Sequence, residues 1–402
     1  MAKIKNTSYK HVENHIINHV RLFDSNGDGY DMTEVFQVLV LNESIINGFM
    51  NGYLLFTDTQ NVIDSLELYG DDILQVDFTS RDQNYEIISD GIRKEFKISN
   101  YSRYPDQQNP KRWVVRLELI STSEYNDDKY KICRSFTNTS NSRFVNYCLD
   151  LLEYQDDRNI EETIHSKDFI VPNISPLQSI NMFNKFSQSK ENSSSDYYFF
   201  ENKDGINYIT SASMINSEPV AKLVKKPTTD VTDYNVIIGY ERSKGYDIPD
   251  QYRFGGYGMK VVSSDMLNKT YYHELFDMNE IKSETGYLNT SLYPEPKEQH
   301  YSHVQFYPNN GYYETIRKSQ AGHLAPYRTI NRTLLTARMA NLTIAGNVEI
   351  KSGSVIDITV PDANKSVSIN ESGKAVVFAI THTLTRKRYT QDIKIASDSV
   401  KL

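Results

Sequence analysis

The chain has 402 residues, enough for about two or three domains, each with a sizeable core. Its 29 tyrosines and 17 phenylalanines, beside a single tryptophan, favour strands and loops over a helical bundle. The formal net charge of −8 argues against a dedicated DNA- or RNA-binding protein, which would carry a basic face. A charge of this size on a chain this long is also ordinary solubility charge.

The two cysteines, Cys133 and Cys148, are too few for a disulfide framework or a metal knuckle. Both are flanked by apolar residues, so we expect two buried free thiols and a reducing compartment. Residues 1–20 lack the continuous apolar core of a signal peptide, and no window approaches the ~18 apolar residues that a membrane helix needs. We therefore expect a protein made and folded in the cytoplasm.

The first third of the chain is dominated by β-structure. Residues 1–20 are predicted to form a polar N-terminal arm, and residues 21–128 a first β-domain. Apolar and β-branched runs of strand length, separated by turn residues, occur at Val35–Leu41, Gly52–Phe56, Ile73–Phe78, Phe96–Ile98 and Trp113–Ile120.

Residues 129–222 change character and are predicted to form an α+β domain. Ser140 can cap a helix that carries apolar residues at helical spacing from Phe144 to Leu152. Ser175 can cap a second helix whose first position is Pro176, where a missing N–H costs nothing.

A hairpin follows this second helix after a polar spacer. Its strands are predicted at Tyr197–Phe200 and Ile206–Ile209, which are aromatic and β-branched. The turn between them is Asn202-Lys203-Asp204-Gly205.

The last part of the chain returns to β-structure. The segment Arg328–Met339 is predicted to be one helix. We expect a second, discontinuous β-domain from residues 223–260 and 326–402, with residues 261–325 as an inserted β and loop region. The final strands are predicted at Leu342–Ile344, Val355–Val360, Ala375–Thr381 and Gln391–Ala396.

The two β-regions contain matching apolar runs. These are Leu68–Phe78 with Ile350–Val360 and Phe96–Ile98 with Phe378–Ile380, both at an offset of 282 positions, and Leu117–Ser121 with Ile393–Ser397 at an offset of 276. Alternating strands match one another easily, so each run alone is weak evidence. The unchanged offset across an intervening turn favours a true internal duplication.

Several of these segments resemble the baseplate (tail) hub proteins of contractile-tailed bacteriophages. In that family a Pro-started helix precedes an aromatic strand ending in a Phe-Glu-x-x-Asp-Gly turn, which here is Phe200 to Gly205. Further segments that resemble the family are Leu22-Phe23-Asp24, Gly52 to Asp58, Gly70-Asp71-Asp72-Ile73, Ala345 to Val355 and Ile380-Thr381-His382. No needle repeat or lysozyme module follows, so a membrane-piercing tip would be another protein.

The resemblance implies an α+β, mainly β fold, in which two tube-like antiparallel β-barrel domains carry inserted α+β domains. It implies a homotrimeric ring whose six similar barrels adapt a sixfold tail tube to a threefold central spike. The implied partners are the tail tube protein ring, the central spike protein, and the baseplate wedge and tape measure proteins, without a membrane. The negative charge then suits a channel that passes DNA without specific binding.

Two other functions remain open at the level of sequence. A carbohydrate-binding tail fibre or receptor-binding protein would also be rich in Tyr and Asn, but predicts a short-period repeat that the sequence lacks. An enzyme would need a catalytic motif, and His300 and His303 near Glu298 do not form HExxH. We therefore expect a structural protein of the virion, with no catalytic residues and no cofactor.

Two patterns resemble metal sites. Asp24 to Gly29 opens like a calcium loop, but its twelfth position is Val35, where a bidentate Glu is required, so a hairpin turn fits better. His11, His15 and His19 would share one face of a helix and could bind Zn²⁺ or Ni²⁺. Apolar residues recur equally well beside them, which favours a docking arm, and we expect no metal.

Overall fold

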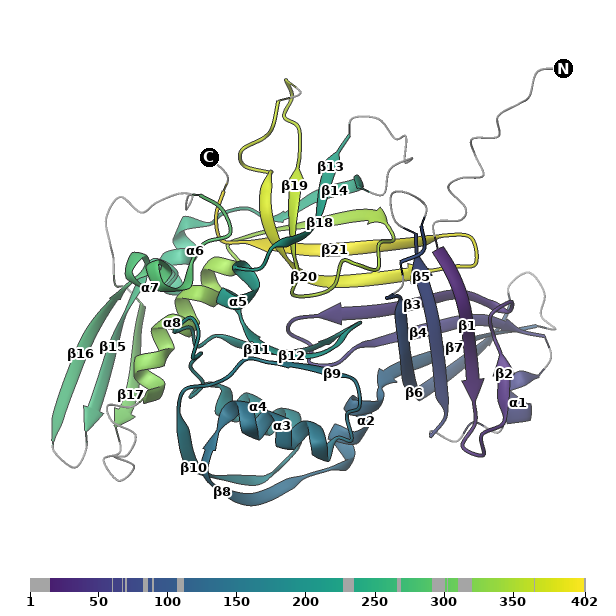
Figure 1. Ribbon diagram of the computed structural model, residues 1–402, viewed down its shortest axis with the longest axis horizontal. Helices are drawn as coiled ribbons and strands as arrows, with labels where there is room; N and C mark the ends of the chain where they lie inside the picture. Colours follow the sequence, from purple (N-terminus) through teal and green to yellow (C-terminus); the bar gives the residue numbers. More distant parts are fainter. Residues whose placement is uncertain are drawn as a thin grey trace.

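The protein is mainly β, and its helices other than α1 lie in two insertions (Figure 1). This computed structural model describes residues 15–59, 61–66, 68, 71–81, 86–88, 90–106, 112–226, 235–265, 269–290, 301, 303–309, 320–364 and 366–400. Within these ranges the strands form one 13-stranded sheet, one two-stranded sheet and two three-stranded sheets. The expected α+β, mainly β fold is confirmed.

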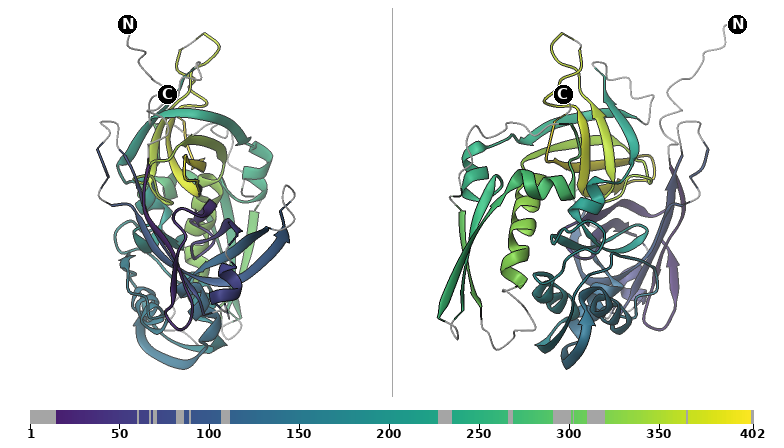
Figure 2. Two further views of the ribbon diagram at one scale, coloured as in Figure 1. Left: turned by 90° about the vertical axis from the view of Figure 1, so that its right-hand side faces the viewer. Right: turned by 60° about the vertical axis from the view of Figure 1, so that its left-hand side comes forward.

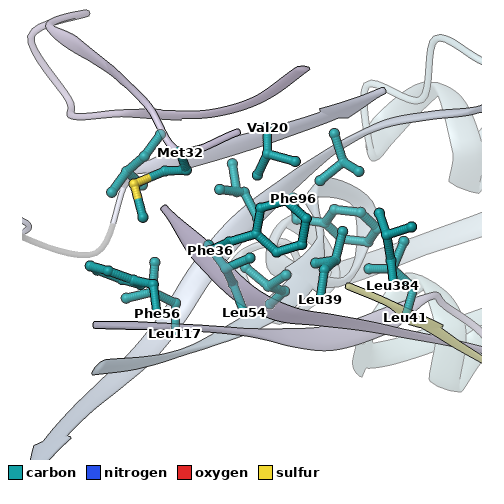
Figure 3. Close-up of a cluster of buried hydrophobic side chains, with 14 of the residues drawn as sticks. Val20, Met32, Phe36, Leu39, Leu41, Leu54, Phe56, Phe96, Leu117 and Leu384 are labelled. Atoms are coloured by element: carbon teal, nitrogen blue, oxygen red, sulfur yellow. The ribbon is translucent and has the colours of Figure 1, made fainter. Parts of the chain in front are cut away.

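One half of the 13-stranded sheet, with strand order β3-β4-β7-β6-β5-β1-β2, forms the first β-domain. Alternate residues of its strands point into one apolar core. Figure 3 shows Phe36, Leu54 and Phe96 in this core, together with Leu384 from the far end of the chain. The elements are β1 (His15–Phe23), β2 (Gly29–Asp31), β3 (Phe36–Ser44), β4 (Asn51–Asp58), α1 (Val62–Leu66), β5 (Ile73–Ser80), β6 (Ile92–Pro105) and β7 (Trp113–Ser121).

The other half of the sheet is a closed six-stranded barrel, because β19 pairs with both β13 and β20. Its interior is packed with aliphatic residues such as Leu223, Leu342 and Ile393. The strands are β13 (Pro219–Lys225), β14 (Val236–Lys244), β18 (Arg338–Ala345), β19 (Val355–Thr359), β20 (Gly373–Leu384) and β21 (Tyr389–Ser397).

An α+β insertion lies between the two β-domains in the chain. Helices α3 and α4 pack on each other, and aromatic residues such as Phe144, Phe183 and Tyr208 fill the core around them. The predicted caps are confirmed, since Ser140 and Ser175 accept the first free helix N–H groups. The elements are α2 (Thr122–Lys129), β8 (Ile132–Ser140), α3 (Asn141–Leu151), β9 (Asp157–Ile160), β10 (Ser166–Ile174), α4 (Pro176–Asn184), β11 (Tyr197–Asn202), β12 (Gly205–Thr210) and α5 (Ser211–Ile215).

A second insertion interrupts the closed barrel between β14 and β18. Its three-stranded sheet, ordered β16-β15-β17, packs against helix α8 and stands at one side of the molecule (Figures 1 and 2). None of the helices in the described part of the chain is long and apolar enough to span a membrane. The elements are α6 (Ile248–Arg253), β15 (Gly258–Asp265), β16 (Thr270–Asp277), α7 (Met278–Thr285), β17 (His303–Asn309) and α8 (Gln320–Leu335).

Three local predictions are wrong. The helix predicted at Arg328–Met339 ends at Leu335, and β18 begins at Arg338, because pairing with β21 and β14 outweighs the helical periodicity. Part of the predicted polar arm is strand β1, which pairs with β5. Cys133 is exposed, because β8 belongs to a two-stranded sheet with one wet face, whereas Cys148 is buried as expected.

The two β-domains share strand order, as the predicted duplication requires. The order β3-β4-β7-β6-β5 is repeated by β14-β18-β21-β20-β19, with antiparallel pairing at every step. Bulges also recur, at Gln37 and Ile238 in the first strands and at Ser99 and Phe378 in the fourth. Shared bulges are stronger evidence than shared alternation, because a bulge marks one particular residue.

One part of the predicted repeat is displaced by three residues. The bulges relate β6 to β20 by 279 positions rather than 282, so Phe96 corresponds to Ala375 and not to Phe378. Sequence alternation could not fix this register, because β20 is buried on both faces. Val377 points into the barrel, while Phe378 packs outside it against the insertions.

We predict that Ser175→Ala destabilises the protein by about 1–2 kcal/mol. The Ser175 hydroxyl accepts from the Gln178 N–H at 3.3 Å and donates to Asp127 at 2.8 Å, so the change loses a helix cap and a buried hydrogen bond. Chemical denaturation measures the loss, with the exposed Ser166→Ala as the control. Equal stabilities of the two variants would contradict the assignment.

Candidate functional site: the junction of the β-domains

The two β-domains are joined by direct strand pairing. β3 pairs antiparallel with β20, from Leu39 opposite Leu384 to Ser44 opposite Ala379, which makes the 13-stranded sheet continuous. The end of the β20–β21 hairpin reaches into the first domain's core. Tyr389 is fully buried there, with its ring 5.3 Å from that of Phe78 in an edge-to-face contact. The closed barrel therefore completes part of the first domain's core.

A chain of buried polar groups crosses this joint. His382 Nε2 lies 3.3 Å from a Glu43 carboxylate oxygen, and both side chains are at most 1% exposed. On its other side, His382 Nδ1 lies 2.8 Å from the Tyr389 hydroxyl and 3.3 Å from Gln391 Nε2. Because a carboxylate oxygen only accepts, Nε2 carries the ring proton and Nδ1 accepts. Burial, and then the Glu43 charge, raise the pKa of Tyr389 far above its usual value, so its hydroxyl stays neutral.

Glu43 also binds two segments from outside its own domain. Its carboxylate accepts the Lys203 N–H at 3.2 Å, in the β11–β12 turn, and the Ser352 N–H at 3.0 Å, in the β18–β19 loop. One carboxylate thus fixes the first β-domain, the closed barrel and the α+β insertion to one another. A buried carboxylate is costly unless its oxygens are hydrogen-bonded, and here they accept from two backbone N–H groups and His382.

The turn that carried the family resemblance is the insertion's contribution to this junction. Glu201 accepts from Lys94 of β6 at 3.3 Å and from the Met50 N–H at 3.2 Å. Asp204 forms ion pairs with the neighbouring Lys203 at 2.6 Å and with Lys351 of the closed barrel. Gly205 has a φ of +148°, and a Cβ there would meet a backbone oxygen at 2.1 Å, so only glycine fits.

The charges around Glu201 shift two neighbouring groups. Burial by itself lowers the pKa of Lys94, but Glu201 and Asp156 outweigh it and raise that pKa above the usual value. Burial, and then the charges of Asp128 and Glu201, raise the pKa of Glu124 to about 7. The ammonium of Lys94 is therefore held among carboxylates, and the Glu124 carboxyl is a weaker acid than an exposed glutamate.

A second buried ion pair ties the other insertion to the end of the chain. Lys282 of α7 lies 2.8 Å from Asp398, with both side chains at most 1% exposed. Asp398 also accepts the Leu288 N–H at 3.2 Å, and the Lys282 ammonium lies 5.2 Å from the Tyr287 ring centre. Both insertions are thus anchored to the β-domains through buried charges.

A groove of about 680 Å³ lies between the two insertions. Its walls come from α4 and β11 on one side and from α6, β17 and α8 on the other, with Arg332 and His303 among the lining residues. The one carboxylate of its lining, Asp250, forms an ion pair with Arg253 at 3.2 Å. This arrangement supplies shape and apolar surface rather than a nucleophile with a base.

The sequence patterns that resembled metal sites are placed as follows. In the described residues, no group of three or more His, Cys, Asp or Glu side chains could hold a metal ion. Asp24 instead accepts the N–H groups of Asn26 and Asp28 at 3.0 and 2.8 Å, which confirms the predicted hairpin turn. His15 and His19 lie on strand β1 rather than on a helix. His11, His300 and Glu298 lie outside the described residues.

The two β-domains of equal strand order, the insertions and the buried junction form a structural scaffold. Comparisons with known proteins relate this scaffold to phage tails. Residues 12–211 match the family model described as baseplate structural protein, domain 1. The chain is 23% identical over 383 residues to the probable baseplate hub protein gp334 of Vibrio phage KVP40. The alignment covers 88% of each chain. Residues 12–211 thus belong to the family of baseplate structural proteins, and the chain as a whole is similar to a baseplate hub protein, as its sequence indicated.

Solved structures show the same fold across most of the chain. A tail protein from Neisseria meningitidis aligns with a TM-score of 0.57 at 9% identity, covering 94% of this chain and 96% of that chain. The 43 kDa tail protein of prophage MuSo2 from Shewanella oneidensis aligns with a TM-score of 0.57 at 10% identity, covering 95% and 98%. At such identities the likeness concerns the fold alone.

Part of the junction is visible in the sequence. The turn from Phe200 to Gly205 and the strand end at His382 were identified through the family resemblance. Glu43 was missed, because it follows the apolar run of β3 between Asn42 and Ser44 and so resembles the polar end of a strand. Lys94 gave no signal, because it stands between Arg93 and Glu95 in a run of charged residues that is typical of an exposed strand.

We predict that Glu43→Ala destabilises the protein by about 3–5 kcal/mol, because it leaves the buried Ser352 N–H, the half-buried Lys203 N–H and His382 without their acceptor. Glu43→Gln keeps one acceptor oxygen and should cost less. Urea denaturation gives both values, with the exposed Glu349→Ala as control. A loss for Glu43→Ala no larger than the control's would disprove the junction's role.

We predict that Glu124→Gln removes part of the pH dependence of stability. The folded pKa of about 7 lies above the ordinary 4.5, so stability from this group is present below the unfolded pKa and is lost as pH rises through the folded one. The variant should therefore gain stability over the natural chain at about pH 8 and not at about pH 4. Urea midpoints at both values test this, with exposed Glu218→Gln as control. Equal gains at the two values would contradict it.

Proposed function

We propose that this protein is the homotrimeric baseplate hub of a phage tail, which adapts the sixfold tail tube to the threefold central spike. One observation supports this most directly: a single chain carries two β-domains with the same strand order and the same bulges. Three such chains in a closed ring present six similar β-domains to a sixfold neighbour. The insertions occur once per chain and so present three copies to a threefold neighbour.

The rigidity of the junction supports the same function. An adaptor must keep its two β-domains in one relative orientation, since a hinge would blur the sixfold arrangement. Here β3–β20 pairing, the Glu43–His382 pair and the Lys94–Glu201 pair all cross between parts of the chain and are buried. Buried polar pairs contribute little net stability, but they favour one arrangement of the domains over others. An adaptor needs such a fixed arrangement.

The partners of the proposed hub are the tail tube ring on one side and the central spike on the other, with the baseplate wedge and tape measure proteins nearby. A ring of this kind lines the channel through which DNA is ejected. The net charge of −8 per chain suits a wall that does not capture phosphate groups. The described strands lie in compact sheets, which supports a hub over the alternative of an elongated carbohydrate-binding tail fibre.

We predict a particle of three times the 46.4 kDa chain mass in size-exclusion chromatography with light scattering. Class averages from negative-stain images should show a ring with six similar lobes around its axis. A chain that stays monomeric at every concentration, alone and with a tube or spike partner present, would overturn the proposed function.

A further inference from the structure

The joint between the two β-domains serves as a template for contacts between copies. Within the chain, residues Leu39–Ser44 of the first β-domain pair with Ala379–Leu384 of the closed barrel. The closed barrel has its own counterpart of β3, which is β14, and the first β-domain has its own counterpart of β20, which is β6. A ring of alternating domains needs a second joint, between these two counterparts.

The shared bulges fix which residues correspond. The bulges at Gln37 and Ile238 place Tyr240 of β14 at the position of Leu39 in β3. The bulges at Ser99 and Phe378 place Pro105 of β6 at the position of Leu384 in β20, and the six residues that follow each bulge correspond one to one.

The edge of β6 at these positions is open in the described structure. Pairing of β6 with β5 runs from Ile92 to Lys97 and stops there, while pairing with β7 continues along the other edge to Pro105. Every residue from Ser99 to Pro105 is exposed, and Tyr101 and Tyr104 are 42% and 47% exposed. An exposed strand edge with aromatic side chains is a template for another strand.

The edge of β14 is open in the same way. Its parallel pairing with β13 involves only Val236 and Ile237, and the described residues include no strand that continues it. The following residues Glu241, Arg242 and Ser243 are exposed. In the joint within the chain, by contrast, the corresponding residues of β3 are buried or half-buried.

The two open edges lie at opposite ends of the molecule. Arg103 of β6 forms an ion pair with Asp64 of α1 at 3.0 Å, and α1 lies at one end of the molecule in Figure 1. β14 leads directly into α6, which lies at the opposite end. The two edges therefore cannot meet within one chain. They can meet between copies, in a head-to-tail contact that closes into a ring.

We propose that residues Tyr101–Pro105 of β6 in one copy pair antiparallel with Tyr240–Lys244 of β14 in the next copy, with Tyr104 opposite Glu241. The partner is a second copy of this chain, and the inference rests on the proposed ring. The register follows from the joint within the chain, where Thr383 lies opposite Val40. Tyr104 corresponds to Thr383, and Glu241 corresponds to Val40.

The side chains fit this pairing, with a different chemistry from the joint within the chain. Arg103 comes opposite Arg242, but each already holds a carboxylate, Asp64 and Glu371 respectively, so two ion pairs meet rather than two bare cations. Pro105, which lacks an N–H, ends the pairing. The two edges that meet between copies are charged and exposed in the single chain, whereas the joint within the chain is buried. The contact between copies can therefore form after each chain has folded.

Disulfide cross-linking tests this pairing in the full-length chain. Tyr104→Cys and Glu241→Cys are combined with Cys133→Ser, which removes the exposed natural thiol. Directly opposite residues have Cα atoms about 5 Å apart, within disulfide range. Mild oxidation should convert most chains into covalent trimers on a denaturing gel, and each single-cysteine variant should not. In the control, Tyr104→Cys with the exposed Lys222→Cys of β13 should not cross-link.

The outcomes separate this inference from the proposed function. Covalent trimers from the first pair alone support the pairing and its register. Light-scattering trimers without that cross-link, or with equal cross-linking of the control, overturn the pairing and leave the trimeric hub standing. Variants that remain folded by circular dichroism but monomeric, like the natural chain, overturn both proposals.

Discussion

The antiparallel pairing of β3 with β20 is the contact on which the rest of the architecture depends. It turns two β-domains into one continuous sheet, and it brings the β20–β21 hairpin into the core of the other domain, where Leu384 and Tyr389 are buried. Strand pairing is directional and spaced by residues, so it fixes distance, angle and register together. The insertions are then positioned against a frame that is already rigid.

Buried charged side chains lie where the β-domains and the insertions contact one another. Glu43 with His382, Glu201 with Lys94, and Asp398 with Lys282 each link elements that are distant in sequence. Such pairs pay a desolvation cost that apolar packing would avoid. Their advantage is that a misplaced domain leaves a buried charge unpaired, so one arrangement is favoured over near alternatives. For a protein whose role is geometric, that selectivity matters more than the last increment of stability.

The two β-domains show which residue offsets between corresponding strands the sequence could predict and which it could not. The offsets of β5 from β19 and of β7 from β21 were both available from the sequence, because these strands alternate cleanly. The offset of β6 from β20 was not, because β20 packs on both faces and Phe378 resembles Phe96 while pointing the other way. Likewise, Met339 continued a helical pattern that pairing with β21 ended.

By itself, the sequence determined the local features: the caps Ser140 and Ser175, the turn from Asn202 to Gly205, and the β-rich class of the fold. These depend on residues close together in the chain, so their chemistry is visible in order. Only the tertiary structure decided that Glu43 meets His382, more than three hundred residues away, and that β3 and β20 join the domains. Such contacts join segments that are far apart in the sequence, and sequence separation does not indicate distance in the folded protein.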